Sequence, residues 1–244
     1  MKDLTLSDIT IMREGYCVVG LEQTAQGVFH SVRPMPPRGY AWHEPFQYSR
    51  GTMVRFMPVA TLASSPHLED QNTEGLAPAG QEVGEVKLVD MLRRAEVSDN
   101  LVGLFGCELH TDSERGNAWA DPSSATRSIC GFEFKNIRFR IFGEPGDVNL
   151  RARLVLPSGE ILNSLPIVDR DWRRFFNDSG PGSSPSRTAP SSETFLNRSI
   201  REELMRAPYR FARIGLARQR LNDEKCWLML DSLFPQPNTA WLPQ

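Results

Sequence analysis

The sequence predicts a mainly β protein built from two small β-barrels packed together. Short runs rich in β-branched and aromatic residues recur between turns that contain Gly or Pro. These runs form two groups, separated by irregular segments. Helical periodicity is confined to two segments, so helices are accessory elements of the predicted fold.

Size and composition exclude several classes of protein. The 244 residues are 40% hydrophobic and 24% charged, unlike a fibrous or wholly disordered chain. No apolar run approaches the roughly 18 residues of a membrane span, and the first residues lack a hydrophobic signal core. The four cysteines lie far apart, which favours reduced thiols. We therefore expect a soluble, cytoplasmic, bacterial-type protein that does not associate with a membrane.

The first group of strands occupies residues 1–100, the expected first barrel. Strands are predicted over residues 9–12, 16–21, 28–34 and 53–59. Residues 64–84 are polar and rich in turn formers, and the region 112–126 is also expected to be irregular. Val86, Val89 and Leu92 recur at helical spacing and predict a connecting helix.

The second group occupies residues 101–244, the expected second barrel. A strand starts at Ile129, and three further strands, over 137–141, 150–156 and 160–162, form a meander. Six Ser, three Pro and two Gly among residues 177–192 predict a mobile loop. A helix over 193–207 and a hairpin of strands 210–216 and 226–230 follow.

The net charge of −2 conceals an asymmetry. Residues 1–121 hold 10 basic and 17 acidic side chains, whereas residues 122–244 hold 18 basic and 13 acidic ones. Of the 28 basic residues, 24 are Arg. Arg binds phosphates through a planar donor fork and stacks on bases, so the excess suits contact with nucleic acid. A GC-rich genome would produce the same excess.

Four arginines in the predicted meander form the sharpest chemical feature. Arg138 and Arg140 share one face of a strand, and Arg151 and Arg153 share a face of its expected hairpin partner. Like charges across a β-ladder are destabilising, so this face requires anions. We expect it to contact nucleic-acid phosphates. Alternatively, carboxylates of the chain itself neutralise it; the candidates are Glu133, Glu144, Glu160 and the acidic first half.

Aromatic residues in the first half offer stacking partners for bases. Tyr40, Trp42, Phe46 and Tyr48 lie in one loop, and Trp42 and Tyr48 are the candidates for base contact. Alternatively, the loop caps the first barrel or packs between the barrels.

His67, Glu69 and Asp70 form a compact group suited to metal binding or acid–base chemistry. A structural role for His67 and Asp70, hydrogen-bonded to the backbone, is the alternative we favour. Cys107 and His110 lack the paired Cys-x2-Cys spacing of zinc sites. Phosphate-binding loops, dinucleotide turns and nucleophile elbows are also absent from the sequence. We therefore assign no catalytic residue, metal or cofactor.

Several landmarks resemble a bacterial family built from two OB folds, the dual OB-fold domain proteins. They span about nine tenths of the chain, in the family's order. The landmarks are the hairpin 11–21, Val32-Arg33-Pro34, His67-Leu68-Glu69-Asp70, Gly215-Leu216-Ala217-Arg218 and the closing strand that ends in Phe234-Pro235. The chain differs in its Ser/Pro-rich loop and lacks a proline after Arg218. The resemblance implies two OB-like barrels and a nucleic-acid or defence context without an established activity.

Three functional hypotheses follow from the sequence. The first is a non-catalytic protein that binds nucleic acid, preferentially single-stranded, through the four arginines, aided by Arg213 and Arg218. The second is a protein–protein adaptor in a defence or nucleic-acid-modification system. The third is a metal-dependent nucleic-acid enzyme that uses His67, Glu69 and Asp70.

Overall fold

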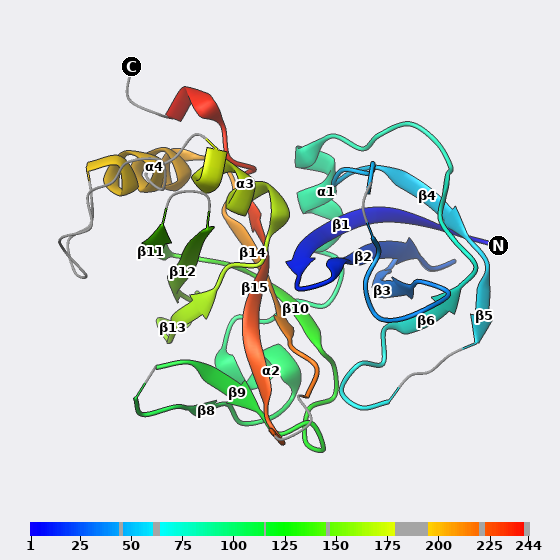
Figure 1. Ribbon diagram of the computed structural model, residues 1–244, viewed down its shortest axis with the longest axis horizontal. Coiled ribbons are helices and arrows are strands. Elements are labelled where there is room, and N and C mark those ends of the chain that lie inside the picture. Colours follow the sequence, from blue (N-terminus) through cyan, green and yellow to red (C-terminus); the bar gives the residue numbers. More distant parts are fainter. Residues whose placement is uncertain are drawn as a thin grey trace.

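The computed structural model describes residues 1–43, 46–60, 64–114, 116–144, 147–178, 195–219 and 223–241. Strands make up 44% of the chain and helices 17%, and the sheets curl into a half-barrel. The predicted mainly β, barrel-like fold is therefore confirmed. Figure 1 shows the sheet of the first half on the right and the meander on the left, with β14 and β15 between them. Within the described ranges, no helix is long and apolar enough to cross a membrane.

The first hundred residues form a seven-stranded sheet in the order β5-β6-β3-β2-β1-β4-β7. Its strands are β1 Lys2–Met12, β2 Gly15–Gln23, β3 Phe29–Met35, β4 Met53–Phe56, β5 Pro58–Ala60, β6 Asp70–Thr73 and β7 Ala77–Pro78. The strand predicted over residues 53–59 is divided at Met57, because β4 pairs with β1 whereas β5 pairs with β6. The segment 64–84 is not all turn, since it contributes β6 and β7.

The pairing of β3 with β6 differs in direction from the antiparallel pairings of the other strands in this sheet. These two strands run parallel, with Arg33 opposite Asp70. Because the side chains of β6 are polar, the pattern of alternating apolar residues does not predict this strand, although its backbone pairs like that of any strand. This pairing places Arg33 next to Asp70, the last residue of the His67-Leu68-Glu69-Asp70 segment.

The predicted connecting helix is α1, Glu85–Leu92. It packs Leu88, Val89 and Leu92 into a cluster that also contains Phe211 and Phe234 of the second half. Val86 was expected on the buried stripe but is 61% exposed, because the buried face is centred on Leu88 and Leu92. The helix therefore belongs to the core that both halves share.

The second half contains a five-stranded sheet in the order β10-β14-β15-β9-β8 and a three-stranded meander. The sheet consists of β8 His110–Thr111, β9 Ala118–Ala120, β10 Ile129–Glu133, β14 Phe211–Leu216 and β15 Cys226–Phe234. The meander consists of β11 Asn136–Glu144, β12 Asp147–Val155 and β13 Ile161–Pro166, and confirms the prediction. The region 112–126, expected to be irregular, contains β9.

Helices cover the second core. They are α2 Leu101–Phe105, α3 Arg170–Asp178 and α4 Phe195–Arg206, followed by the short 3-10 helix η2 Thr239–Trp241. Trp172 of α3 stacks on Phe139 of the meander, with ring centroids 5.3 Å apart. The predicted helix over 193–207 is confirmed by α4. Of the loop predicted over 177–192, the first two residues end α3 and the others lie outside the described residues.

The two halves are in direct contact through β1 and the second half. Ile11 N donates to Val168 O at 2.8 Å, and Ser232 Oγ donates to Ser7 O at 3.3 Å. A buried ion pair joins Arg213 of β14 to Asp8 of β1, with Nε and Oδ2 3.2 Å apart. Charged side chains therefore lie inside the contact between the halves.

Candidate functional site

The four arginines of the meander share one outer surface, which we call the arginine face: Arg138, Arg140, Arg151 and Arg153. Arg138 lies directly opposite Arg153, and Arg140 lies opposite Arg151. The alternate residues point inward and are buried, as a strand period of two requires. These are Ile137, Phe139, Ala152 and Leu154. Two like-charged pairs therefore face each other across β11 and β12.

The guanidinium groups of this face differ in their partners. Arg138 and Arg140 are exposed and Arg153 is half-buried. In the part of the chain that the structure describes, none of these three forms an ion pair. Arg151 is anchored, because its Nη1 donates at 2.6 Å to both Asn117 Oδ1 and Ser164 O. With respect to the described residues, these three cations are available to an external anion.

Two of the carboxylates proposed to neutralise the face, those of Glu133 and Glu160, are engaged elsewhere. Glu133 accepts from Arg93 Nε at 2.7 Å. Glu160 accepts from Ser158 Oγ at 2.8 Å and from the backbone N of Leu101 at 3.1 Å. The side chain of Glu144 lies outside the described residues. Glu133 and Glu160 therefore do not neutralise the arginine face.

The aromatic candidates of the first half are held within that half. Trp42 Nε1 donates to Pro34 O at 2.9 Å, and Tyr48 Oη donates to Leu76 O at 3.1 Å. Both rings are partly buried and pack with Phe46 against the first core. This placement agrees with the alternative in which the loop caps the first sheet.

Arg213 and Arg218 lie away from the arginine face. Arg213 is 1% exposed and bonds Asp8 and Ser31, so the expectation that it contacts a phosphate is corrected. An arginine buried between two sheets cannot reach the backbone of a surface ligand. Arg218 is partly exposed, pairs with Asp70 and lies over the ring of Tyr40, with its Cζ 4.8 Å from the centroid.

The motif around His67 becomes one group of side chains, which we call the His67 cluster: the buried Arg33, His67 and Asp70, and the partly exposed Arg218. Arg33 Nη1 donates to Asp70 Oδ1 at 2.8 Å and lies 3.1 Å from His67 Nδ1. A guanidinium only donates, so Nδ1 is an acceptor and the ring proton lies on Nε2. Next to this cluster, Arg33 Nη2 donates to Ser128 Oγ at 3.1 Å, and Glu69 accepts from the backbone N and Oγ of Ser128 at 2.8 and 2.9 Å.

The electrostatics of the His67 cluster do not suit a metal. Burial, together with the guanidinium groups of Arg33 and Arg218, lowers the pKa of His67 to about 3. Asp70 already pairs with both arginines. Two fixed cations would repel a divalent ion, and the described residues contain no group of three metal-ligating side chains. The cluster joins β3 and β6 to the second half through contacts between side chains, whereas the structural alternative expected hydrogen bonds to the backbone.

Several buried charges between the halves were not anticipated from the sequence. Burial and the neighbouring Asp8 carboxylate raise the pKa of Asp231 to about 8. Burial also raises the pKa of Asp169 to about 6, against the opposing charge of Arg50, whose Nη1 lies 3.0 Å from Asp169 Oδ2. In the sequence, such a buried charge is indicated by a single charged residue inside an apolar strand, as in Leu230-Asp231-Ser232-Leu233.

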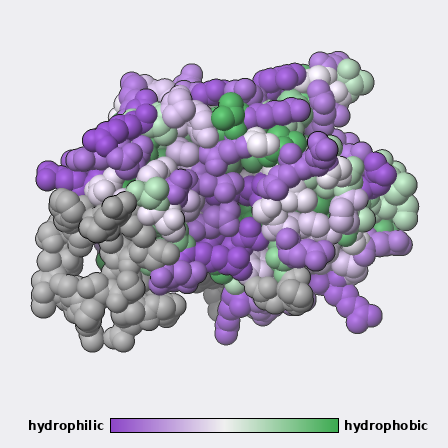
Figure 2. Space-filling model, turned by 90° about the horizontal axis from the view of Figure 1, so that it is seen from above, coloured by the Kyte–Doolittle hydropathy of each residue, from purple (hydrophilic) through white to green (hydrophobic). Residues whose placement is uncertain are grey.

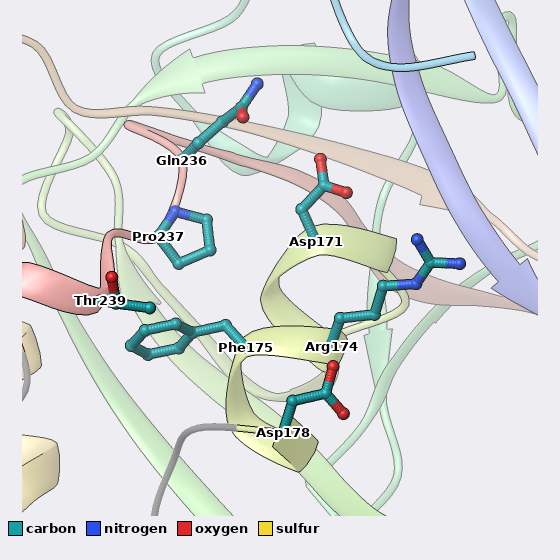
Figure 3. Close-up of a pocket in the computed structure, with 7 residues that line it drawn as sticks. All are labelled: Asp171, Arg174, Phe175, Asp178, Gln236, Pro237 and Thr239. Atoms are coloured by element: carbon teal, nitrogen blue, oxygen red, sulfur yellow. The ribbon is translucent and has the colours of Figure 1, made fainter. Parts of the chain in front are cut away.

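A pocket of about 230 Å³ lies between α3 and the C-terminal segment. Figure 3 shows Phe175 of the helix directed toward Pro237 and Thr239 and Asp171 on the side of Gln236, with Arg174 and Asp178 directed away. Asp171 already pairs with Arg50 and Arg170. From above, Figure 2 shows mainly hydrophilic residues, with apolar ones in small separate patches. The side chains that line the pocket between α3 and the C-terminal segment therefore do not converge on an enclosed space.

The fold and its charges define a mainly β, barrel-like protein with a cationic sheet face and a buried ionic contact between its halves. No protein-family model, curated protein sequence or solved structure gives a significant match to the chain. The resemblance to the dual OB-fold family therefore stays a prediction.

Proposed function

We propose that the protein is a non-catalytic nucleic-acid-binding module that holds a phosphate backbone on the arginine face. The observation that supports this most directly is the cross-strand pairing of Arg138 with Arg153 and of Arg140 with Arg151. Like charges directly opposite each other destabilise a sheet. Cross-strand pairs typically change stability by roughly 0.2–1 kcal/mol each. A bound polyanion offsets this repulsion by placing phosphates over the guanidinium groups.

The partners of the surrounding residues support the same proposal. Glu133 and Glu160 are held by other groups, while Arg138 and Arg140 are exposed. Arg151, fixed by Asn117 and Ser164, provides one rigid cation on the face. Arg favours phosphates because its donor fork matches two phosphate oxygens.

The test is binding of labelled single-stranded DNA, single-stranded RNA and duplex DNA, followed by fluorescence anisotropy across a salt series. Affinity should fall linearly on a log–log plot, with a slope of about 0.7 per contacted phosphate on single strands and about 0.9 on a duplex. Arg138→Gln and Arg153→Gln should each lower that slope by about one contact. Both substitutions lie at the surface and leave the inward residues intact.

Arg55→Gln is the matched control. Arg55 is also a partly exposed arginine on a strand, but it lies on β4 of the first sheet, where it pairs with Asp3 at 2.6 Å. Its substitution should leave the salt slope unchanged. If Arg138→Gln and Arg153→Gln also leave affinity for every nucleic acid unchanged, the proposal is wrong. Binding of an acidic protein without any binding of nucleic acid would favour the adaptor hypothesis.

A further inference from the structure

Three rings from three different strands line up beside the arginine face. His110 of β8 lies opposite Trp119 of β9, and Trp119 lies opposite Trp227 of β15. The His110 and Trp119 rings are stacked, with centroids 4.3 Å apart and planes 29° from parallel. We call His110, Trp119 and Trp227 the aromatic ladder. It crosses the end of the five-stranded sheet at its β8 edge.

The ladder lies on the outer side of the sheet. Its strand neighbours Ala118, Ala120, Cys226 and Leu228 point inward and are buried. His110 is exposed, and both indole rings are partly exposed. Because β8 is the edge strand, the imidazole forms the outer end of the stack. Large aromatic surface at an exposed sheet edge is costly to leave in water unless a ligand covers it.

A cation lies over the ladder. Lys225 Nζ is 4.9 Å from the Trp119 centroid and 5.4 Å from the Trp227 centroid. Trp227 Nε1 donates to Asp223 Oδ2 at 2.6 Å, which fixes the orientation of that indole. Among the nearby acids, Asp121 accepts from the N and Oγ of Ser123 at 2.8 and 2.7 Å. The ladder thus combines aromatic rings with an ammonium group that lies over two of them.

The ladder and the arginine face form one continuous surface. Asn117 and Trp119 flank the buried Ala118, so both lie on the outer side of this segment. Asn117 Oδ1 accepts from Arg151 Nη1 at 2.6 Å, which ties the ladder strand to the arginine face. Figure 1 shows β8 and β9 directly below β13, the third strand of the meander.

We infer that the aromatic ladder stacks nucleobases of a single-stranded nucleic acid whose phosphates lie on the arginine face. This inference rests on the proposed function, and it names the class of nucleic acid. Flat rings at a surface bind any base through its π-face, but the bases of a duplex are already stacked inside it. Lys225, at the ladder, adds one contact to a phosphate.

The decisive experiment compares two probes of equal charge on the unmodified protein. One is a thymidine oligonucleotide, and the other is an abasic oligonucleotide of the same length. The thymidine strand should bind about five- to a hundredfold more tightly and quench tryptophan fluorescence, as expected for a stacked base. Equal affinity for both probes would overturn the stacking inference and leave phosphate binding intact. Failure of both probes to bind would overturn the proposed function itself.

Substitutions then locate the stacking. His110→Ala should reduce the preference for the thymidine strand and leave abasic affinity unchanged; an unchanged preference would exclude His110 from the stack. The matched control is His30→Ala, an exposed histidine on β3 of the first sheet. Trp119→Phe should keep the preference, whereas Trp119→Leu should abolish it, provided that both variants melt like the parent. A Leu variant that keeps the preference would contradict the inference.

Discussion

Individual charged residues inside the strands give this protein its most unusual residue-level chemistry. Asp8, Arg213 and Asp231 lie on β1, β14 and β15, and each is at most 5% exposed. Arg213 pairs with Asp8, while Asp231 faces Asp8, Arg33, Arg213 and Asp169. Burial favours the neutral form of a carboxyl group, which explains why the pKa of Asp231 is raised.

This raised pKa predicts that stability falls as pH rises from about 4 to about 8. The folded protein holds the Asp231 proton up to about pH 8, whereas the unfolded chain releases it near pH 3.9. The folded state therefore binds more protons, and the unfolding free energy falls with pH by up to about 1.4 kcal/mol per unit. His67, with its pKa lowered to about 3, acts in the opposite direction only below about pH 6.5.

Urea unfolding at pH 6.5 and pH 8.5 measures this effect. The parent should be less stable at pH 8.5, and Asp231→Asn should remove most of the difference. Asp3→Asn serves as the control, because Arg55 lowers the pKa of Asp3, so that group does not titrate in this interval. A parent protein whose stability is constant or increases between the two pH values would refute the assignment.

At the level of elements, the β11–β12 pair combines the predicted alternation of inward and outward residues with unfavourable charge. Sequence alternation correctly predicted which residues face outward, because side-chain period depends only on strand geometry. The sequence did not predict the short strands β8 and β9, because two or three residues are too few to show a periodic pattern. Trp119 was therefore missed, although it flanks the arginine face.

Arg138→Glu should stabilise the protein while it weakens binding. The new carboxylate would face Arg153 directly and replace repulsion by attraction, for a gain of about 0.5–1 kcal/mol. Chemical unfolding gives the stability, and the salt-series titration gives the affinity. Arg138→Gln, which only removes the repulsion, should lie between the parent and the Glu variant in stability. A destabilised Glu variant would mean that Arg138 already has a favourable partner.

The whole molecule is held together by contacts between its two halves. Arg50 of the first half reaches Asp169, and Arg33 reaches Ser128. Asp169 also accepts from the backbone N of Leu233 at 2.9 Å, so it links the Arg50 contact to β15. An apolar cluster around α1 includes Phe211 and Phe234 of the second half. Separation of the halves would expose this cluster and leave buried charges without partners.

A fragment of residues 1–100 should therefore not fold cooperatively on its own, although it contains every strand of the first sheet. Removing one partner of a buried ion pair typically costs about 3–5 kcal/mol, and the fragment loses the ion-pair partners of Asp8 and Arg50. Circular dichroism with urea unfolding, alongside the full chain, tests this. A cooperative transition in the fragment would instead establish residues 1–100 as an independent domain.

The sequence by itself determined the local features: the mainly β class, the meander, α4 and the common face of the four meander arginines. These depend on residues close together in the chain, where strand and helix periods act directly. Tertiary structure alone decided that Arg213 is buried and that Arg33, His67, Asp70 and Arg218 meet. It also decided that Trp119 stacks beside His110. Such contacts join distant segments, and their free energy depends on burial and on partners that no local pattern encodes.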